Sequence, residues 1–141
     1  MSGVDRRATK SEVRIGFKDF ALQQLSDTQC SARVVLAWHP GEEFVGTAEG
    51  EDSPHGQLRS AAEATARALE AATHGQVELT VLAVKALTTL ETVLVVVSLS
   101  SRVDQRSERL VGSCLIKEQP AHGAVLAVLD ATNRLLSIYL R

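Results

Sequence analysis

Two stretches of this sequence decide its fold, because each can be laid over the other. The first is Pro54-His55-Gly56-Gln57-Leu58-Arg59-Ser60-Ala61-Ala62-Glu63-Ala64-Thr65-Ala66-Arg67-Ala68-Leu69, and the second is Ala121-His122-Gly123-Ala124-Val125-Leu126-Ala127-Val128-Leu129-Asp130-Ala131-Thr132-Asn133-Arg134-Leu135-Leu136. A His-Gly pair, an acidic residue followed by Ala-Thr, and an Arg-x-Leu triplet recur in step. Upstream, Phe44-Val45-Gly46-Thr47 aligns with Leu110-Val111-Gly112-Ser113. An internal repeat fixes the architecture, so we read the chain as one duplicated unit, residues 13–75 and 76–141.

Three segments with a period of two precede each of these stretches, and this period is typical of strands with one buried face. In the first copy the alternating positions are Val13, Ile15 and Phe17, then Cys30, Ala32, Val34, Leu36 and Trp38, then Phe44, Gly46 and Ala48. In the second copy they are Val77, Leu79, Val81 and Ala83, then Val93, Val95, Val97 and Leu99, then Leu110, Gly112, Cys114 and Ile116. The segments 23–29 and 88–89 are expected to be turns.

The repeated stretches themselves have the spacing of helices with one buried face. Ser53 is a favourable N-cap, Pro54 suits the first helical position, and Gly75 is expected to end the first helix. Gln119-Pro120 opens the second helix. The predicted buried faces are Leu58, Ala61, Ala62, Thr65, Leu69 and Ala72, and then Val125, Val128, Leu129, Thr132, Leu135 and Leu136.

Three strands in a run followed by a helix predict an α+β fold, since successive strands without crossovers pair antiparallel. We expect two β-β-β-α repeats with pseudo-two-fold symmetry, in which antiparallel three-stranded sheets pack with two helices. Alanines on the first helix permit close approach of the second helix. Residues 13–141 form a single domain, and residues 1–12 are predicted to be a polar flexible tail.

The composition excludes several classes of function. Among 141 residues there are 15 basic and 17 acidic side chains, a net charge of −2, so no overall field attracts nucleic acid or an anionic membrane. The basic cluster Arg6, Arg7, Lys10 and Arg14 is interpreted as part of a solvated tail rather than a nucleic-acid arm. No apolar leader and no membrane-spanning run occur, so a cytoplasmic location is expected.

The motifs of common catalytic and metal sites are missing from the sequence. There is no Gly-rich phosphate loop, Cys-x-x-Cys, His-Glu-x-x-His or Gly-x-Ser-x-Gly, and the histidines lack zinc-ligand spacing. We therefore expect no enzyme activity, no metal and no cofactor. Cys30 and Cys114 fall at apolar strand positions, which favours small buried residues over a disulfide or redox pair.

Two histidines in equivalent first turns give one candidate ligand site. His55 and His122 each follow a helix start, where free N–H groups and the helix dipole favour an anion. The alternative is an inherited helix-start sequence with exposed rings. The candidate ligand-binding residues are Gly50, Glu51, Ser53, His55, Gln119 and His122. Gly46 and Gly112 recur within strands, which a bulge, a close backbone approach or a ligand would each explain.

The duplicated pattern resembles the C-terminal regulatory (dimerisation) domain of α-isopropylmalate synthase and citramalate synthase. The matching pieces are Gly46-Thr47-Ala48-Glu49-Gly50 leading into Pro54, and Leu129–Leu136, within a resemblance that spans about residues 13–138. The catalytic barrel of that family has no counterpart here. The family's Gly-x-Gly-Pro-x-Asp-Ala turn is replaced by Gly50-Glu51-Asp52-Ser53, and the Asp-Ile pair that opens its second helix is replaced around Gln119-Pro120. The resemblance implies a stand-alone dimerising or ligand-sensing module, and these departures affect the turns that bind the family's feedback amino acid.

Two functions are therefore expected from the sequence. The first is a non-catalytic, self-associating regulatory or small-ligand-binding module, with a small carboxylate or amino acid as ligand. The alternative is a structural or protein-interaction subunit with no small-molecule ligand. A homodimer is expected in either case, because exposed sheet edges and the valine-rich strand 93–99 would be covered by a second copy.

Overall fold

The duplicated unit is a three-stranded antiparallel sheet followed by a helix, and the chain contains it twice. The computed structural model describes residues 15–38 and 41–139. The first copy comprises β1 (Gly16–Gln24), β2 (Gln29–Ala37), β3 (Glu43–Glu51) and α2 (Pro54–Ala72). The second comprises β4 (Glu78–Thr89), β5 (Thr92–Val103), β6 (Arg106–Ile116) and α3 (Pro120–Tyr139). The expected α+β class and both β-β-β-α repeats are confirmed.

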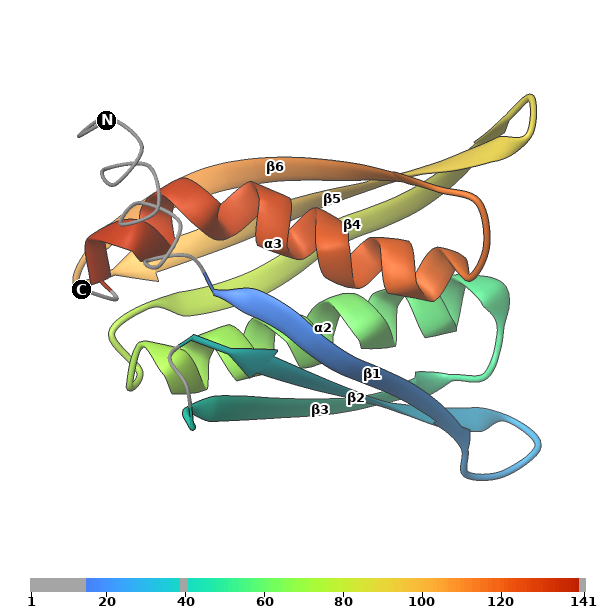
Figure 1. The fold of residues 1–141 in the computed structure, drawn as a ribbon, viewed down its shortest axis with the longest axis horizontal. Helices are drawn as coiled ribbons and strands as arrows, with labels where there is room; N and C mark the ends of the chain where they lie inside the picture. Colours follow the sequence, from blue (N-terminus) through green and yellow to red (C-terminus); the bar gives the residue numbers. More distant parts are fainter. Residues whose placement is uncertain (1–14, 39–40, 140–141) are drawn as a thin grey trace, which may run out of the picture.

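The two helices lie between the two sheets (Figure 1). α2 packs on β2 and β3 of its own copy and also contacts β4, while α3 packs on β5 and β6 and contacts α2. Both helices begin at the same end of the molecule, where the β4–β5 hairpin also projects (Figure 1). Each sheet therefore turns one face towards the helices and the other face outwards.

The strand ladders share one irregularity and differ in length. The pairing shifts at Lys18 in β1 and at Leu82 in β4, so both copies carry a bulge at the equivalent place. Strands of the first copy have nine residues each, whereas β4 and β5 have 12 and β6 has 11. The extra residues lengthen the β4–β5 hairpin, and its tip residue Leu90 is fully exposed.

The core between the sheets consists of valine, leucine and alanine. The fully buried side chains include Val34, Leu36, Leu69, Val95, Val97, Leu99, Val125 and Val128. All six residues predicted for the buried face of α2 are buried, and so are Ser60, Ala64, Ala66 and Ala68. In α3 the predicted face is buried except for Leu135, which is half-buried. α2 is therefore buried around most of its circumference, because it has a sheet on either side.

Gly46 and Gly112 allow each helix to approach its sheet closely. A Cβ atom on Gly46 would lie 1.9 Å from the Ala64 carbonyl oxygen and 2.4 Å from the Ala68 nitrogen. A Cβ atom on Gly112 would lie 2.2 Å from the Ala127 oxygen. Helix backbone therefore occupies the space of the missing side chain, which decides between the three explanations in favour of close approach.

The ends of α2 follow the predicted chemistry with one correction. Ser53 is the N-cap, and its hydroxyl accepts a hydrogen bond from the Gly56 N–H at 3.0 Å. The helix ends at Ala72 with Thr73 as C-cap, so the prediction that Gly75 caps it was two residues late. His74 (φ 54°) reverses the chain first, and the His74 and Gly75 N–H groups bond the carbonyls of Ala71 and Glu70. This pattern is a Schellman motif with a histidine at the position that glycine usually occupies.

Polar side chains of α2 close part of the free edge of β4. The Arg59 guanidinium donates to the Val81 carbonyl at 2.8 Å, and the Arg67 guanidinium donates to the Leu79 carbonyl. The Leu79 N–H donates in turn to the Glu70 carboxylate at 2.8 Å. These bonds satisfy backbone groups that an edge strand would otherwise leave open to another strand.

The predicted strand ends and cysteine environments were partly wrong. β1 continues to Gln24 and β4 to Thr89, so residues 23–24 and 88–89 belong to strands rather than turns. Cys30 is buried as expected, Cys114 is only half-buried, and both thiols are free. The predicted tail 1–12 with its basic cluster, and Val13, lie outside the described residues.

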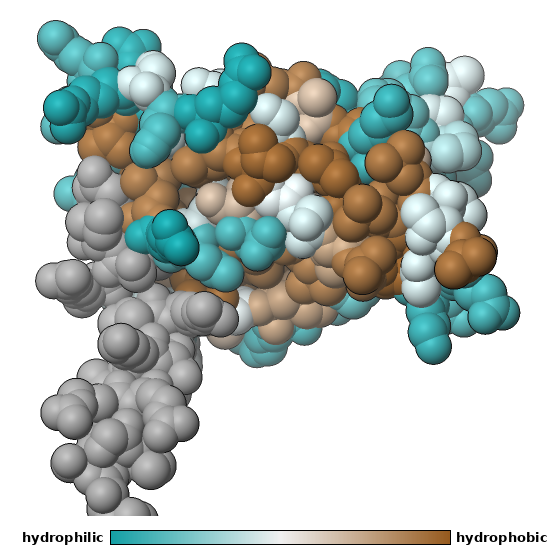
Figure 2. All heavy atoms as spheres, turned by 90° about the horizontal axis from the view of Figure 1, so that it is seen from above, coloured by the Kyte–Doolittle hydropathy of each residue, from teal (hydrophilic) through white to brown (hydrophobic). Residues whose placement is uncertain are grey.

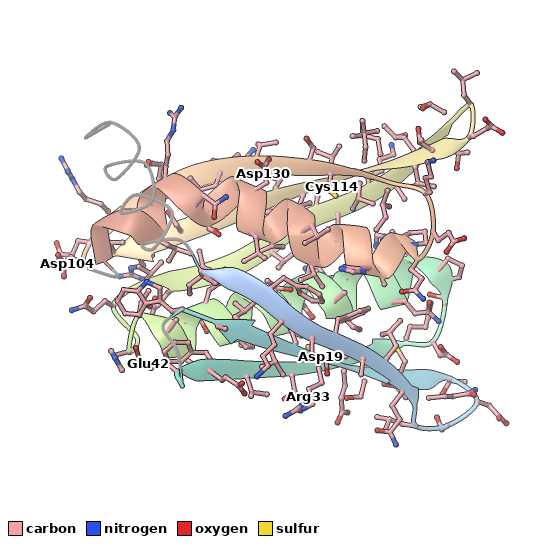
Figure 3. The ribbon with its side chains drawn as sticks, in the orientation of Figure 1. Asp19, Arg33, Glu42, Asp104, Cys114 and Asp130 are labelled. Atoms are coloured by element: carbon pink, nitrogen blue, oxygen red, sulfur yellow. The ribbon has the colours of Figure 1, made fainter. Side chains whose placement is uncertain are left out.

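The outer faces of the two sheets differ in polarity. Residues on the outer face of β1–β3 include Asp19, Ala21, Arg33, Val45, Thr47 and Glu49. We define the outer β4–β6 face by Ala83, Lys85, Leu87, Leu94, Val96, Ser98, Val111, Ser113 and Leu115. Hydrophobic side chains run across the middle of this face, with hydrophilic ones towards its ends (Figure 2). By contrast, Arg33 projects from the other sheet away from the helices (Figure 3).

Candidate functional site

A hollow lies at the end of the molecule where both helices begin. Its volume is 360 Å³, and it is lined by Phe20, Leu22, Gln57, Gln119, Pro120 and Ala121. These residues come from β1 and from the first turns of α2 and α3. Residues from both helix starts therefore line the same hollow.

The start of α2 uses most of its own hydrogen-bond donors. Pro54 has no N–H, the Gly56 N–H binds the Ser53 hydroxyl, and the Gln57 N–H donates to the Ser53 carbonyl at 2.8 Å. The backbone of Gly56 also packs closely on Glu51, since a Cβ atom there would lie 2.0 Å from the Glu51 oxygen. Few N–H groups remain at this helix start to bind an anion.

The start of α3 is built differently from that of α2. Gln119 is exposed and has a φ of 55°, and its carbonyl accepts hydrogen bonds from the His122 and Gly123 N–H groups at 2.9 and 3.3 Å. The His122 ring is half-buried against β1, with its centroid 4.7 Å from that of Phe17 and 6.2 Å from that of Phe20. His122 therefore packs α3 on β1, whereas the equivalent His55 is exposed to solvent.

The six predicted site residues fall into two groups. Gln119 lines the hollow, and His122 lies next to it through its contact with Phe20. The other four are Gly50, Glu51, Ser53 and His55, which belong to the turn from β3 into α2 and are not among the lining residues. At Gly50 the structure explains glycine without a ligand, because a Cβ atom there would lie 2.3 Å from the Ser60 hydroxyl.

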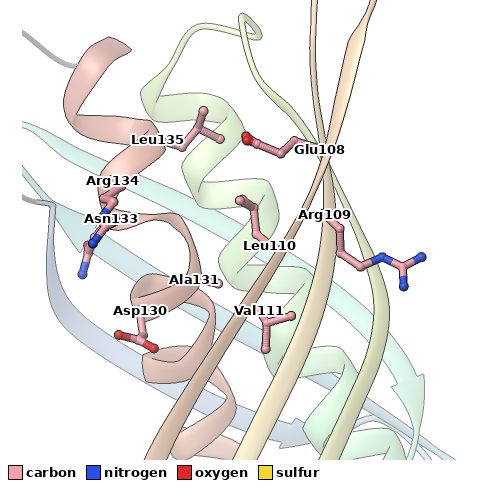
Figure 4. Close-up of a pocket in the computed structure, with 9 residues that line it drawn as sticks. All are labelled: Glu108, Arg109, Leu110, Val111, Asp130, Ala131, Asn133, Arg134 and Leu135. Atoms are coloured by element: carbon pink, nitrogen blue, oxygen red, sulfur yellow. The ribbon is translucent and has the colours of Figure 1, made fainter.

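A larger groove, of 660 Å³, lies between β6 and α3 and was not predicted from the sequence. It is lined by Glu108, Arg109, Leu110, Val111, Asp130, Ala131, Asn133, Arg134 and Leu135. Leu110, Ala131 and Leu135 point into the space, and the Glu108 carboxylate points across it towards Leu135 (Figure 4). The charged ends of Arg109 and Arg134 point away on opposite sides (Figure 4). Charged groups therefore do not converge in it. Its residues follow the ordinary strand and helix periods, so no sequence signal distinguishes them.

Asp130 connects this groove to the edge of the sheet. Its carboxylate accepts a hydrogen bond from the Ser113 N–H at 3.0 Å, and it lies near the Cys114 thiol (Figure 3). Burial, and secondly the charge of Asp130, raise the pKa of Cys114 above its ordinary value of 9.0. A raised pKa disfavours the thiolate, so this cysteine lacks the activation that a nucleophile needs.

Within residues 15–38 and 41–139, histidine, cysteine, aspartate and glutamate side chains form no cluster that could hold a metal ion. Neither described helix is long and apolar enough to cross a membrane.

Comparisons with known proteins leave the family of the chain unassigned. No family model matches the sequence, and no curated protein is significantly similar to it.

Proposed function

We propose that this chain is a non-catalytic, self-associating module that forms a homodimer through the outer β4–β6 face. The observation that carries the proposal is the contrast between two equivalent positions. Val45 and Val111 are aligned in the repeat, and both are exposed, by 43% and 63%. Across the strands, Val45 shares its row with Val35 and Asp19, whereas Val111 shares its row with Ser98 and Ala83. The row of the first sheet thus carries a carboxylate beside its two valines, whereas the row of the second sheet carries no charge.

The exposure of large apolar side chains supports this assignment. On the outer β4–β6 face, Leu87 is 43%, Val111 63% and Leu115 67% exposed. Leu82, at the bulge of β4, is 42% exposed. Contiguous exposed apolar surface of this kind is uncommon on monomers and marks interaction sites. The resemblance to a dimerising regulatory domain points in the same direction.

The face is large enough for a stable contact. A three-stranded sheet about 14 Å wide and about 40 Å long covers roughly 550 Å² in projection, from the usual strand spacing and rise. Projecting side chains add accessible area, which brings each copy near the ~800 Å² that a standard interface buries on each partner. Face-to-face packing of two such sheets, about 10 Å apart, is a common arrangement in proteins.

Light scattering on purified protein tests the proposal with a matched pair of variants. We expect the parent chain to be a dimer at tens of micromolar, by order of magnitude. Val111→Lys should give a monomer, because a lysine would be buried in the contact, whereas Val45→Lys should leave the dimer intact. A monomeric parent chain would contradict self-association, and in that case the face would bind a different protein, which is the alternative function. Equal effects of the two variants would exclude this face.

The hollow at the helix starts supports a second candidate function, the binding of a small carboxylate or amino acid. Phe20, Leu22 and Pro120 provide apolar walls, and Gln57 and Gln119 provide amides. The Gln57 amide already donates to the Asp52 carboxylate at 3.0 Å. Because the helix donors are largely used, these amides would supply the polar contacts.

A thermal-shift screen with amino acids and carboxylic acids tests this candidate, since a ligand specific for the folded chain raises the melting temperature. Gln119→Ala should remove the shift, and His55→Ala, outside the hollow, should keep it. His122→Ala is less informative, because this ring also packs on Phe17. If no compound changes the melting temperature, the hollow has no such ligand.

A further inference from the structure

We infer that the two chains of the homodimer pack with their two-fold axis parallel to β5, so that β4 of one chain lies over β6 of the other chain. This inference rests on the proposed self-association through the outer β4–β6 face. It follows from the order of side chains on that face, which the strand registers determine.

Three rows of side chains cross the face from β4 to β6. Among rows that span all three strands, the one nearest the hairpin tip is Leu87, Leu94 and Leu115, and only the pair Thr89 and Thr92 lies nearer the tip. The next row is Lys85, Val96 and Ser113, and the third is Ala83, Ser98 and Val111. A fourth row, Thr80, Ser100 and Arg109, follows beyond the bulge at Leu82. The leucine row is therefore the most apolar of the four, and the charged side chains are Lys85 in the second row and Arg109 in the fourth.

A two-fold axis parallel to β5 lays each row over the same row of the partner chain. The order of the strands is reversed, so the β4 end of a row lies over its β6 end in the partner. Leu87 then lies over Leu115, and the small Ala83 lies over the larger Val111. Lys85 lies over the hydroxyl of Ser113, and Arg109 lies over that of Thr80. Each cation thus meets a small polar side chain, and each leucine meets a leucine.

A two-fold axis across the strands is the other way to join the two faces, and it is less favourable. It lays β4 over β4 and β6 over β6 and reverses the order of the rows. If the axis passes through the Lys85 row, the two lysines lie over each other; if it passes midway along the four rows, the leucine row lies on the row that contains Arg109. Like charges in a contact and a buried charge against leucine are both destabilising. The charge pattern therefore favours the axis along the strands.

Mixing two variant proteins tests the arrangement. Val111→Glu and Ala83→Lys should each abolish the homodimer, because each places unpaired charges in the contact. In the 1:1 mixture, Glu at position 111 of one chain faces Lys at position 83 of the other, and the second Ala83–Val111 contact is native. We expect a heterodimer with a Kd at least roughly tenfold lower than that of either variant alone, weakened by added salt. Both positions are exposed, so circular dichroism should show unchanged folding.

A second mixture, of Val111→Glu with Val111→Lys, separates the two arrangements. It should stay monomeric, because position 111 faces position 83 and not itself. If a heterodimer forms in this mixture and not in the first, the axis along β5 is overturned and an arrangement with β6 over β6 is supported. The proposed self-association would still stand. If the parent chain is a dimer but the first mixture forms no heterodimer, the axis along β5 is overturned and the proposed face is not. A monomeric parent chain, or two variants that both remain dimeric, would overturn the proposed face as well.

Discussion

At the scale of single residues, two glycines determine the separation between helix and sheet. Gly46→Ala would place a methyl group 1.9 Å from the Ala64 oxygen, which is backbone and cannot swing aside. We expect a loss of about 1–3 kcal/mol or more in the free energy of unfolding, as in other overpacked cores. Urea unfolding measures it. Gly16→Ala is the control, because its Cβ atom would lie 3.7 Å from the nearest atom, and this variant should match the parent. An equal loss in both would refute the close-approach explanation.

Cys114 gives a prediction for the dependence of stability on pH. Its pKa is raised in the folded chain, by burial first and by Asp130 second, above the ordinary 9.0. Folding thus favours the protonated thiol. The contribution of Cys114 to the free energy of unfolding is therefore complete below pH 9.0 and is lost as the pH rises through the pKa of the folded chain. When the free energy of unfolding is measured from pH 8 upwards, it should fall less with rising pH in Cys114→Ala than in the parent chain.

Asp130→Asn provides the matching kinetic measurement. Removing the carboxylate should lower the pKa of Cys114 and speed its reaction with an aromatic disulfide reagent at mildly alkaline pH. The reaction of Cys30 should be slow in both proteins, because its side chain is 2% exposed. An unchanged rate at Cys114 would show that the carboxylate does not act on the thiol.

The two first-turn histidines show what sequence could not predict at this scale. Their equivalence in the repeat was clear, but their surroundings differ because of β1. Phe17 and Phe20 offer aromatic faces to His122, whereas the corresponding strand positions around the bulge of β4 are Val81 and Val84. A sequence repeat matches a residue to its counterpart but does not identify which partner from the other copy reaches it.

At the scale of elements, the helix side chains that bind β4 make a testable contribution. In Glu70→Ala the Leu79 N–H loses its acceptor, and we expect a loss of about 1–2 kcal/mol in the free energy of unfolding. Hydrogen exchange of the Leu79 amide should also be faster in Glu70→Ala than in the parent chain. Glu63→Ala is the control, because its carboxylate pairs with Arg59 on the surface and such pairs contribute little. Unchanged protection of Leu79 would mean that the edge is closed by other means.

Hydrophobic period predicted every strand and helix of the described chain, but not where the strands stop. Gln23, Gln24, Thr88 and Thr89 are polar, yet backbone pairing continues through them, because a ladder needs only N–H and C=O groups. Caps were more informative: Ser53 and Pro54 begin α2 as predicted. The all-round burial of α2 was not predicted, since alanine and serine are compatible with a surface as well as an interior.

At the scale of the whole molecule, neither copy has a complete core of its own. α2 packs on its own sheet and on β4, and α3 packs on its own sheet and reaches β1 through His122. We therefore expect fragments 1–75 and 76–141 to be largely unfolded alone and to regain structure when mixed. Circular dichroism of each fragment and of the mixture would show it. A cooperative melting transition in either isolated fragment would contradict this dependence.

The layer of helices between the sheets also affects how the molecule can change over generations. Because one full layer separates the two outer faces, a substitution on one does not disturb the packing beneath the other. After the duplication, the first sheet could keep charged side chains on its exterior while the second acquired leucines at matching positions. One ancestral surface could thus become two with different tasks, at little risk to the interior that both copies share.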